Sequence, residues 1–187
     1  MNESTPAQVL IQEHRIIQRV VAAMAVIADE LREGRRVDPQ DLRDMLTFLR
    51  VFADECHHGK EEQYLFPLLE ARGVPATGCP VGVLKNEHVK GRTLVAQFAE
   101  AIETYAGDGS AGRDALIAAL AGLVELYPNH IWKEDYLLLP MADKVLSAAD
   151  QKTLAEQFER VEAQMGQGTH EKFEQLAQRL ENRANSA

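Results

Sequence analysis

Two stretches of the chain repeat one pattern: residues 57–67 read HHGKEEQYLFP, and residues 130–140 read HIWKEDYLLLP. The alignment places His57 on His130, and in each stretch a glutamate follows the histidine four positions later. Residues four apart project from the same face of an α-helix and can converge on one point. The repeat therefore predicts two helices that each direct an imidazole and a carboxylate toward a common site.

The correspondence between the two halves of the chain extends upstream of both stretches. Glu13-His14 precedes the first stretch, and Glu87-His88 precedes the second at nearly the same distance. Each half thus has a histidine on its first helix and a His-x-x-x-Glu motif on its second. When the halves associate, four histidines and two carboxylates are expected at one level of a bundle. These are His14, His57, Glu61, His88, His130 and Glu134.

Apolar residues recur at intervals of three and four along four segments, which is the pattern of amphipathic helices. These segments are residues 10–31, 42–68, 81–105 and 116–145. Turn-forming residues separate them at Asp38-Pro39, 73–80 and 107–112, and no segment alternates as a β-strand does. Four long helices with short connections predict an all-α fold, an up-and-down antiparallel four-helix bundle.

We expect the bundle to occupy residues 1–146 and a C-terminal helical extension to occupy residues 147–187. Ser147 and Asp150 have the spacing of a helix N-cap with an acidic third position. The apolar stripe that follows, as far as Met165, carries no histidine, so the extension is expected to pack on or beside the bundle as cover. Three prolines are expected to kink or locally break the second and fourth helices without ending them. They are Pro67, Pro128 and Pro140.

Charge and composition exclude several classes of partner. The 187 residues carry a formal net charge of -9 and a pI near 5.2, without a local cluster of lysine or arginine. Such a chain repels phosphate backbones, so neither nucleic acid nor a membrane surface is an expected partner. The cysteines Cys56 and Cys79 lack a paired spacing, and the apolar run 20–28 is too short to span a bilayer. With a polar start that lacks a signal peptide, these features favour a cytoplasmic protein.

Six polar side chains inside apolar stripes need partners, because an unpaired buried carboxylate is far more costly than a paired one. A bound cation would satisfy them together. Six imidazole and carboxylate ligands exceed what one tetrahedral zinc ion uses. They suit two metal ions that prefer six ligands and share the carboxylates, with iron favoured and manganese or zinc as substitutes.

At these residues the sequence resembles the hemerythrin-like proteins, the HHE cation-binding group, over roughly residues 8 to 146. The strings HHGKEE and HIWKED carry the resemblance, and the order H, HxxxE, H, HxxxE looks like a variant found among mycobacterial members. The resemblance implies a four-helix bundle that holds two iron ions joined by an oxo or hydroxo bridge. It also implies that the four histidines are terminal ligands and that Glu61 and Glu134 bridge the irons.

The sequence departs from the oxygen-carrying members of this group on its third and fourth helices. Those members place two histidines four apart on the third helix, whereas here His88 has Leu84 and Arg92 at those positions. On the fourth helix they use an aspartate that would be Asp135. The repeat and the spacing of four residues favour Glu134 instead.

Four further histidine and tyrosine side chains have open or peripheral assignments. His58 either supplies the missing ligand, as in an iron-sensing protein of this fold, or pairs with Glu62 beside the site. Tyr64 and Tyr127 lie on the ligand stripes, where each either hydrogen-bonds a small ligand of the metals or fills core space. His170 lies outside both halves and is expected at the surface.

The resemblance implies redox chemistry with small molecules. A di-iron centre with an open position would react with peroxide and with nitric oxide, in peroxidase-like or catalase-like reactions. The alternative is a module that binds oxygen reversibly, or that senses oxygen or iron through folding linked to metal occupancy. The single histidine on the third helix argues against a simple oxygen carrier. The sequence leaves any protein partner open.

Overall fold

The computed structural model describes residues 4–107, 111–166 and 168–186. Residues 108–110, in the middle of the predicted glycine-rich turn, and Gln167 lie outside these ranges. Within them the regular structure is helical and includes no strand, which confirms the predicted all-α class.

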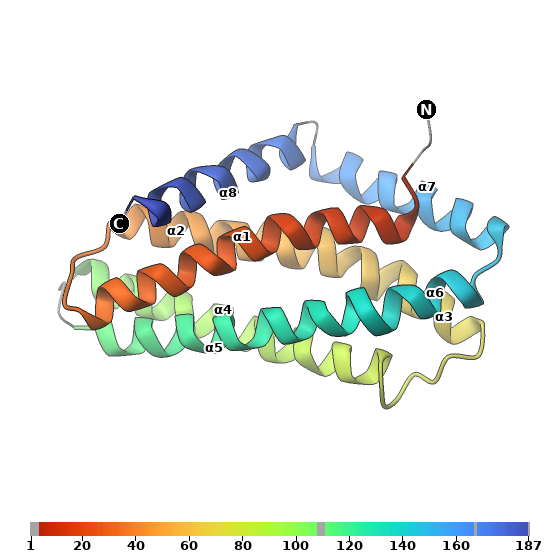
Figure 1. Cartoon of the computed structure of the whole chain (residues 1–187), viewed down its shortest axis with the longest axis horizontal. Helices are drawn as coiled ribbons and strands as arrows, with labels where there is room; N and C mark the ends of the chain where they lie inside the picture. The colour runs from red at the N-terminus through yellow and green to blue at the C-terminus, as the bar shows by residue number, and fades with distance from the viewer. Residues whose placement is uncertain (1–3, 108–110, 167, 187) are drawn as a thin grey trace.

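Four long helices form the bundle, and successive helices run in opposite directions (Figure 1). The first is α1 (Pro6–Arg32) and the third is α4 (Val81–Gly107). The second is continuous and consists of α2 (Pro39–Phe48), η1 (Leu49–His58), η2 (Glu61–Leu65) and α3 (Phe66–Ala71). The fourth is also continuous and consists of α5 (Arg113–Lys133), η3 (Glu134–Leu138) and α6 (Leu139–Val145). This is the predicted up-and-down arrangement.

Both long helices that carry the duplicated motif contain π-helical turns next to it. In η2 and η3 a backbone N–H donates to the carbonyl five residues earlier, which belongs to Glu61 and to Glu134. A proline follows each of these turns after one intervening residue, and it has no N–H to continue the α-helical pattern. The α-helical pattern is thus interrupted just before Pro67 and Pro140, in line with the prediction. At Pro128 the predicted break is absent, because α5 stays α-helical through this residue.

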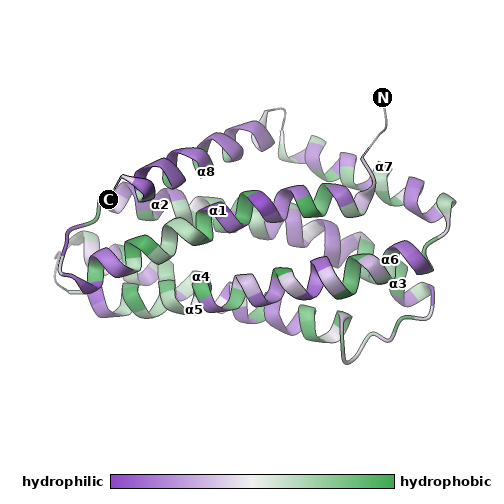
Figure 2. Ribbon diagram, in the orientation of Figure 1, coloured by the Kyte–Doolittle hydropathy of each residue, from purple (hydrophilic) through white to green (hydrophobic). Residues whose placement is uncertain are grey.

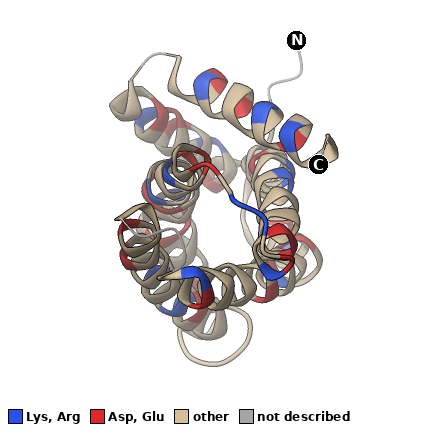
Figure 3. Ribbon diagram, turned by 90° about the vertical axis from the view of Figure 1, so that its left-hand side faces the viewer, with Lys and Arg blue, Asp and Glu red and all other residues tan. Residues whose placement is uncertain are grey.

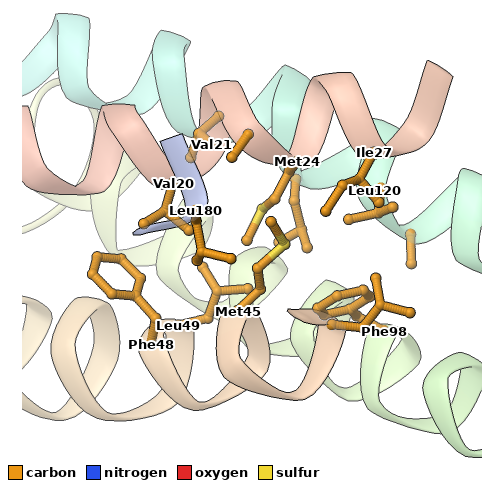
Figure 4. Packing of buried hydrophobic residues seen from close by; sticks show 14 of the residues in the cluster. Val20, Val21, Met24, Ile27, Met45, Phe48, Leu49, Phe98, Leu120 and Leu180 are labelled. Atoms are coloured by element: carbon orange, nitrogen blue, oxygen red, sulfur yellow. The ribbon is translucent and has the colours of Figure 1, made fainter. Parts of the chain in front are cut away.

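Two apolar clusters fill the bundle and leave a polar layer between them. The larger cluster joins α1, α2, η1, α4 and α5; Figure 4 shows Met24, Phe98 and Leu120 among the side chains that meet there. The smaller cluster gathers around Leu10 and Phe66 toward the other end of the bundle. Green hydrophobic and purple hydrophilic residues intermingle along the bundle helices in Figure 2, consistent with one buried face on each helix.

The C-terminal helices α7 (Ala148–Met165) and α8 (Thr169–Asn185) pack against α1 and the second long helix (Figure 1). Viewed end-on, they lie to one side of the bundle (Figure 3). Ser147 and Asp150 form the predicted capping box at the start of α7. Leu154 and Phe158 of α7 enter the smaller apolar cluster, and Phe173 of α8 enters the larger one. The extension therefore covers the bundle along both clusters.

The described helices also bear on the predictions about membranes and cysteines. None of them combines the length and the apolar character that a bilayer crossing needs. Cys56 is buried, Cys79 is exposed, and both are free thiols. The unpaired spacing of the cysteines in the sequence agrees with this finding.

The connection between α1 and α2 is held to α4 by one buried side chain, Tyr105. Its hydroxyl accepts a hydrogen bond from the N–H of Val37 at 3.0 Å. Replacing Tyr105 by Phe leaves this buried N–H unpaired, so we expect the free energy of unfolding to fall by about 1–3 kcal/mol. Urea denaturation should show the loss, whereas Tyr136→Phe, which removes an exposed hydroxyl, should have little effect. Equal effects of both substitutions would contradict this role of Tyr105.

Candidate metal centre

The polar layer brings together all six side chains that the duplicated motifs single out. None of them is more than 3% exposed. They come from all four long helices: His14 from α1, His57 and Glu61 from the second, His88 from α4, and His130 and Glu134 from the fourth. The predicted meeting of the two halves at one level of the bundle is therefore observed.

The two histidines of each half face each other through their Nε2 atoms. His14 Nε2 lies 3.0 Å from His57 Nε2, and His88 Nε2 lies 3.2 Å from His130 Nε2. Two nitrogen lone pairs repel each other at such distances. Each pair therefore needs a proton or a metal ion at its centre.

The carboxylate of Glu134 lies between the two histidine pairs. Its Oε2 is 3.1 Å from His14 Nε2, and its Oε1 is 3.0 Å from His130 Nε2. One carboxylate thus contacts a histidine of each half. Asp135, the neighbouring residue on the chain, lies farther out, on the Nδ1 side of His14.

Glu61 takes the equivalent place in the other half. Its Oε2 is 3.4 Å from His88 Nε2 and 3.9 Å from His57 Nε2. In the described part of the chain, none of the four carboxylate oxygens of Glu61 and Glu134 has a partner with hydrogen-bonding geometry. Unpaired buried carboxylates are costly, and a cation between the carboxylates and the imidazoles removes that cost. The donor set of the layer therefore fits a bound metal.

A second ring of carboxylates orients the histidines. Each histidine of the layer contacts an outer carboxylate through Nδ1, which turns its Nε2 inward. The pairs are His14 with Asp135 (2.7 Å), His57 with Glu13 (2.8 Å), His88 with Glu62 (2.6 Å), His130 with Glu87 (3.0 Å) and His58 with Asp54 (3.2 Å). A carboxylate on Nδ1–H fixes the tautomer whose Nε2 lone pair can bind a metal, and metal-ligating histidines commonly have such a partner.

The donors fall into two groups of four that share the carboxylate of Glu61. One group is His14, His57, Glu61 and Glu134, and the other is His58, Glu61, His88 and His130. Within each group the donor atoms lie within 4.8 Å of one another, and all seven residues are buried. Nitrogen and oxygen donors of this kind suit iron, manganese and zinc.

Comparison with known proteins agrees with this donor set. The family model of the hemerythrin HHE cation binding domain matches residues 5–142. The chain belongs to the hemerythrin HHE cation-binding family. The resemblance predicted from the duplicated strings is thereby confirmed.

Relatives of this hemerythrin-like chain include proteins of two bacterial genera. An uncharacterised protein of Mycobacterium tuberculosis (strain H37Rv) is 29% identical over 162 residues, which cover 83% of this chain and 60% of the relative. The iron-sulfur cluster repair protein YtfE of Edwardsiella ictaluri is 31% identical over 134 residues, which cover 70% of this chain and 60% of the relative. The match thus spans less than two thirds of either relative. No solved structure gives a significant match.

His58 is buried inside the polar layer. Its ring stacks on that of His88, with the centroids 3.9 Å apart. The predicted pairing of His58 with Glu62 is wrong, because Glu62 contacts His88 and Arg92 while Asp54 contacts His58. Burial lowers the pKa of His58 to about 3, so its ring is neutral at pH 7. Its Nε2 is buried without a hydrogen-bond partner, as expected of an atom with a lone pair to donate.

Neither Leu84 nor Arg92, the residues four positions before and after His88 on α4, is among the donors of the layer. Leu84 packs in the smaller apolar cluster. Arg92 points outward and forms ion pairs with Asp54 at 2.7 Å and with Glu62 at 3.0 Å. Arg92 therefore fixes two outer carboxylates and does not face the donors.

The other side chains with open assignments lie in different surroundings. Tyr127 is buried beside His58, with ring centroids 6.4 Å apart, and burial raises the pKa of its phenol. Tyr64 is half-buried and packs against the smaller apolar cluster. His170 is partly exposed, but α8 folds back on the second long helix, and the His170 ring lies 5.3 Å from that of Phe52.

The outer carboxylates, and the lysines that hold two of them, were not predicted to orient the histidines. Lys60 donates to Glu13, and Lys133 donates to Glu87 at 2.7 Å. A signal for these residues was present in the repeat, because Glu precedes the first histidine and Lys follows the second by three in both halves. Polar residues that recur in both halves next to ligands were thus candidates for orienting them.

A cavity of about 160 Å³ opens beside the layer, between η1 and α4. Its lining includes Arg50, Asp54, His58, Arg92 and Tyr127. This volume is smaller than the pockets that hold drug-sized ligands, but it admits several water-sized molecules. Small molecules therefore have a place to approach the layer next to His58.

Protons and metal ions compete for the nitrogens of the layer. When no metal is bound, burial lowers the pKa of these histidines, but neighbouring carboxylates outweigh this effect. Asp135 and Glu134 raise the pKa of His14 to about 10, and Glu134 raises the pKa of His130 to about 9. These histidines hold protons at pH 7 and must release them to bind a metal. The apparent affinity for Zn²⁺ should therefore rise between pH 7 and pH 9, by about tenfold per unit for each proton released.

Titration calorimetry in two buffers of different ionisation enthalpy would count these protons. We expect net proton release at pH 7. An affinity that stays constant from pH 7 to pH 9, with no proton release, would contradict the prediction.

Proposed function

We propose that the layer holds two iron ions and that the protein uses them in reactions with peroxide and with nitric oxide. The observation that carries this proposal is the pair of buried four-donor groups that share the Glu61 carboxylate. A single ion would leave donors of one group unsatisfied. The proposal rests on this layer and not on the activity of the relatives, of which the match covers 60%.

The proposed ligands follow from the contacts in the layer. Glu61 and Glu134 face histidines of both halves and would bridge the ions. The terminal ligands would be His14, His57, His88 and His130, with His58 completing the second group. With His58 included, each group has four donors, which supports His58 as a ligand.

Iron is favoured over manganese and zinc by the relatives and by the chemistry proposed. The name of one relative describes the repair of iron-sulfur clusters. When bound, iron would supply one-electron redox changes and a Lewis acid in a water-poor site. The donor set itself also suits manganese and zinc, so metal analysis has to decide among them.

The protein residues around the layer select the size of the reactant. All donors are buried, so a large substrate cannot reach them. The cavity lined by His58, Arg92 and Tyr127 has room for molecules the size of hydrogen peroxide or nitric oxide. Tyr127 keeps its phenol proton because burial raises its pKa, so it can donate a hydrogen bond to a reactant held there.

Reversible oxygen binding is the competing function, and one observation weighs against it. In the described part of α4, His88 is the histidine that enters the layer, whereas the resemblance implies two from this helix in oxygen carriers. The second donor group is completed from the second long helix through His58 instead. A different ligand set on one ion supports a different reactivity.

The full chain produced with ample iron should contain about two iron atoms, given two donor groups. Replacing Glu134 by Ala removes a carboxylate that contacts both halves, so the iron content should fall by about half or more. Elemental analysis of the purified proteins measures this. Glu125→Ala changes an exposed glutamate of the same long helix and should keep full iron content. Full iron content in Glu134→Ala, or zinc alone in the unchanged protein, would refute the di-iron proposal.

The iron-loaded protein should consume hydrogen peroxide, and nitric oxide, faster than the same protein after removal of iron. Oxygen should oxidise the reduced protein without a reversible coloured adduct. Absorption spectra recorded while oxygen is added and then withdrawn test this. A coloured form that appears and disappears with oxygen, together with no consumption of peroxide or nitric oxide, would establish the carrier function in place of the enzyme.

A further inference from the structure

We propose that α7 positions one side of the hemerythrin-like centre, through a chain of hydrogen bonds that runs from Glu162 to His57. The inference rests on the proposed metal centre and concerns how firmly its two sides hold their ions. Glu162 is a positioning residue in this proposal, because it touches neither a metal nor a reactant.

The chain of hydrogen bonds is continuous from the surface to the layer. Lys60 Nζ donates to Glu162 Oε1 at 2.8 Å and also donates to Glu13. Glu13 in turn accepts from His57 Nδ1 at 2.8 Å. His57 Nε2 then faces His14 across 3.0 Å in the layer.

Lys60, the middle residue of this hydrogen-bond series, is fully buried, and α7 covers it. The exposed fraction of Lys60 is 0%, and that of Glu13 is also 0%. The ring of Phe158 lies under the ammonium, 5.7 Å from Nζ to the centroid. A buried ammonium is costly unless several acceptors surround it, so Lys60 depends on Glu162 as its second carboxylate.

The other half of the centre has an equivalent series of hydrogen bonds, but no residue of α7 takes part in it. Lys133 donates to Glu87 at 2.7 Å, and Glu87 contacts His130 at 3.0 Å. Lys133 is 24% exposed, and it also donates to the carbonyl of Asn129 on its own helix. Water can complete the hydrogen bonds of Lys133, so this half needs no equivalent of Glu162. The two halves repeat in sequence but differ in what holds the outer carboxylate.

This difference has a consequence for metal retention. The outer carboxylate on a ligating histidine sets its orientation, and loss of such a partner typically costs about 10–100-fold in metal affinity. Glu162 acts one step farther out, and its side chain is 42% exposed. Its loss should free Lys60 and Glu13 to move and should loosen the His14–His57 side about three- to tenfold, a smaller effect than loss of Glu13 itself.

The test measures the release of ferrous iron to the chelator ferrozine, without oxygen, from the full-length iron-loaded protein. Two ions in unlike surroundings should leave in two phases. Glu162→Ala should accelerate one phase about three- to tenfold and leave the other unchanged. Glu162→Gln, whose amide oxygen can still accept from Lys60, should fall between Ala and the unchanged protein. Glu87→Gln, in the other half, should accelerate the other phase and so assign the phases.

Glu159→Ala is the matched control, because Glu159 is exposed on the same helix. It should change neither phase. Equal acceleration of both phases by Glu162→Ala, or loss of stability to urea in the iron-free protein without a selective phase, would show that α7 is only a cover. No change in either phase would overturn the role of Glu162 while leaving the di-iron proposal intact. An unchanged protein that holds no iron would instead overturn the proposed centre, and this inference with it.

Discussion

The structure depends on the balance of charge in one buried layer, where the carboxylates of Glu61 and Glu134 lie among facing imidazoles. Their four oxygens lack partners with hydrogen-bonding geometry in the described structure, and the histidine nitrogens approach each other to 3.0 and 3.2 Å. Neither feature is favourable without cations. The apolar clusters on both sides of the layer keep water away and so increase this requirement. The burial of these side chains therefore creates a need for cations, in agreement with the cation binding of the family.

The duplication of the sequence explains why both halves supply similar donors to the layer. Two departures from the duplication explain why the two sides of the layer differ. Each half contributes two histidines, a carboxylate and a lysine that holds an outer glutamate. The second half has the apolar Ile131 where the first has His58, so the donors are shared unequally. The C-terminal helix α7 covers Lys60 and leaves Lys133 partly exposed. A nearly symmetric sequence therefore produces an asymmetric centre.

The long helices and the inner donors could be predicted from sequence because both depend on periodicity along one helix. The outer contacts could not, because they depend on packing between helices. Glu13 adjoins His14 on the chain but contacts His57, since neighbouring residues on a helix point in directions about 100° apart. Asp54 and Glu62 both lie four residues from His58, so spacing alone could not choose between them. The contact of His170 with Phe52 could not be predicted either, because nothing in the local sequence shows that α8 folds back onto the second long helix.

The two sides of the layer are also unequal in access. The His14–His57 side lies under α7, and its outer lysine has no exposed surface. The cavity of about 160 Å³ instead reaches His58, which belongs to the other donor group. In the proposed centre, a reactant entering this cavity would meet the His58 side, while the covered side retains its ion. In the proposed centre, the fold would thus separate holding metal from meeting a reactant, although both tasks would draw on the same shared carboxylate, Glu61.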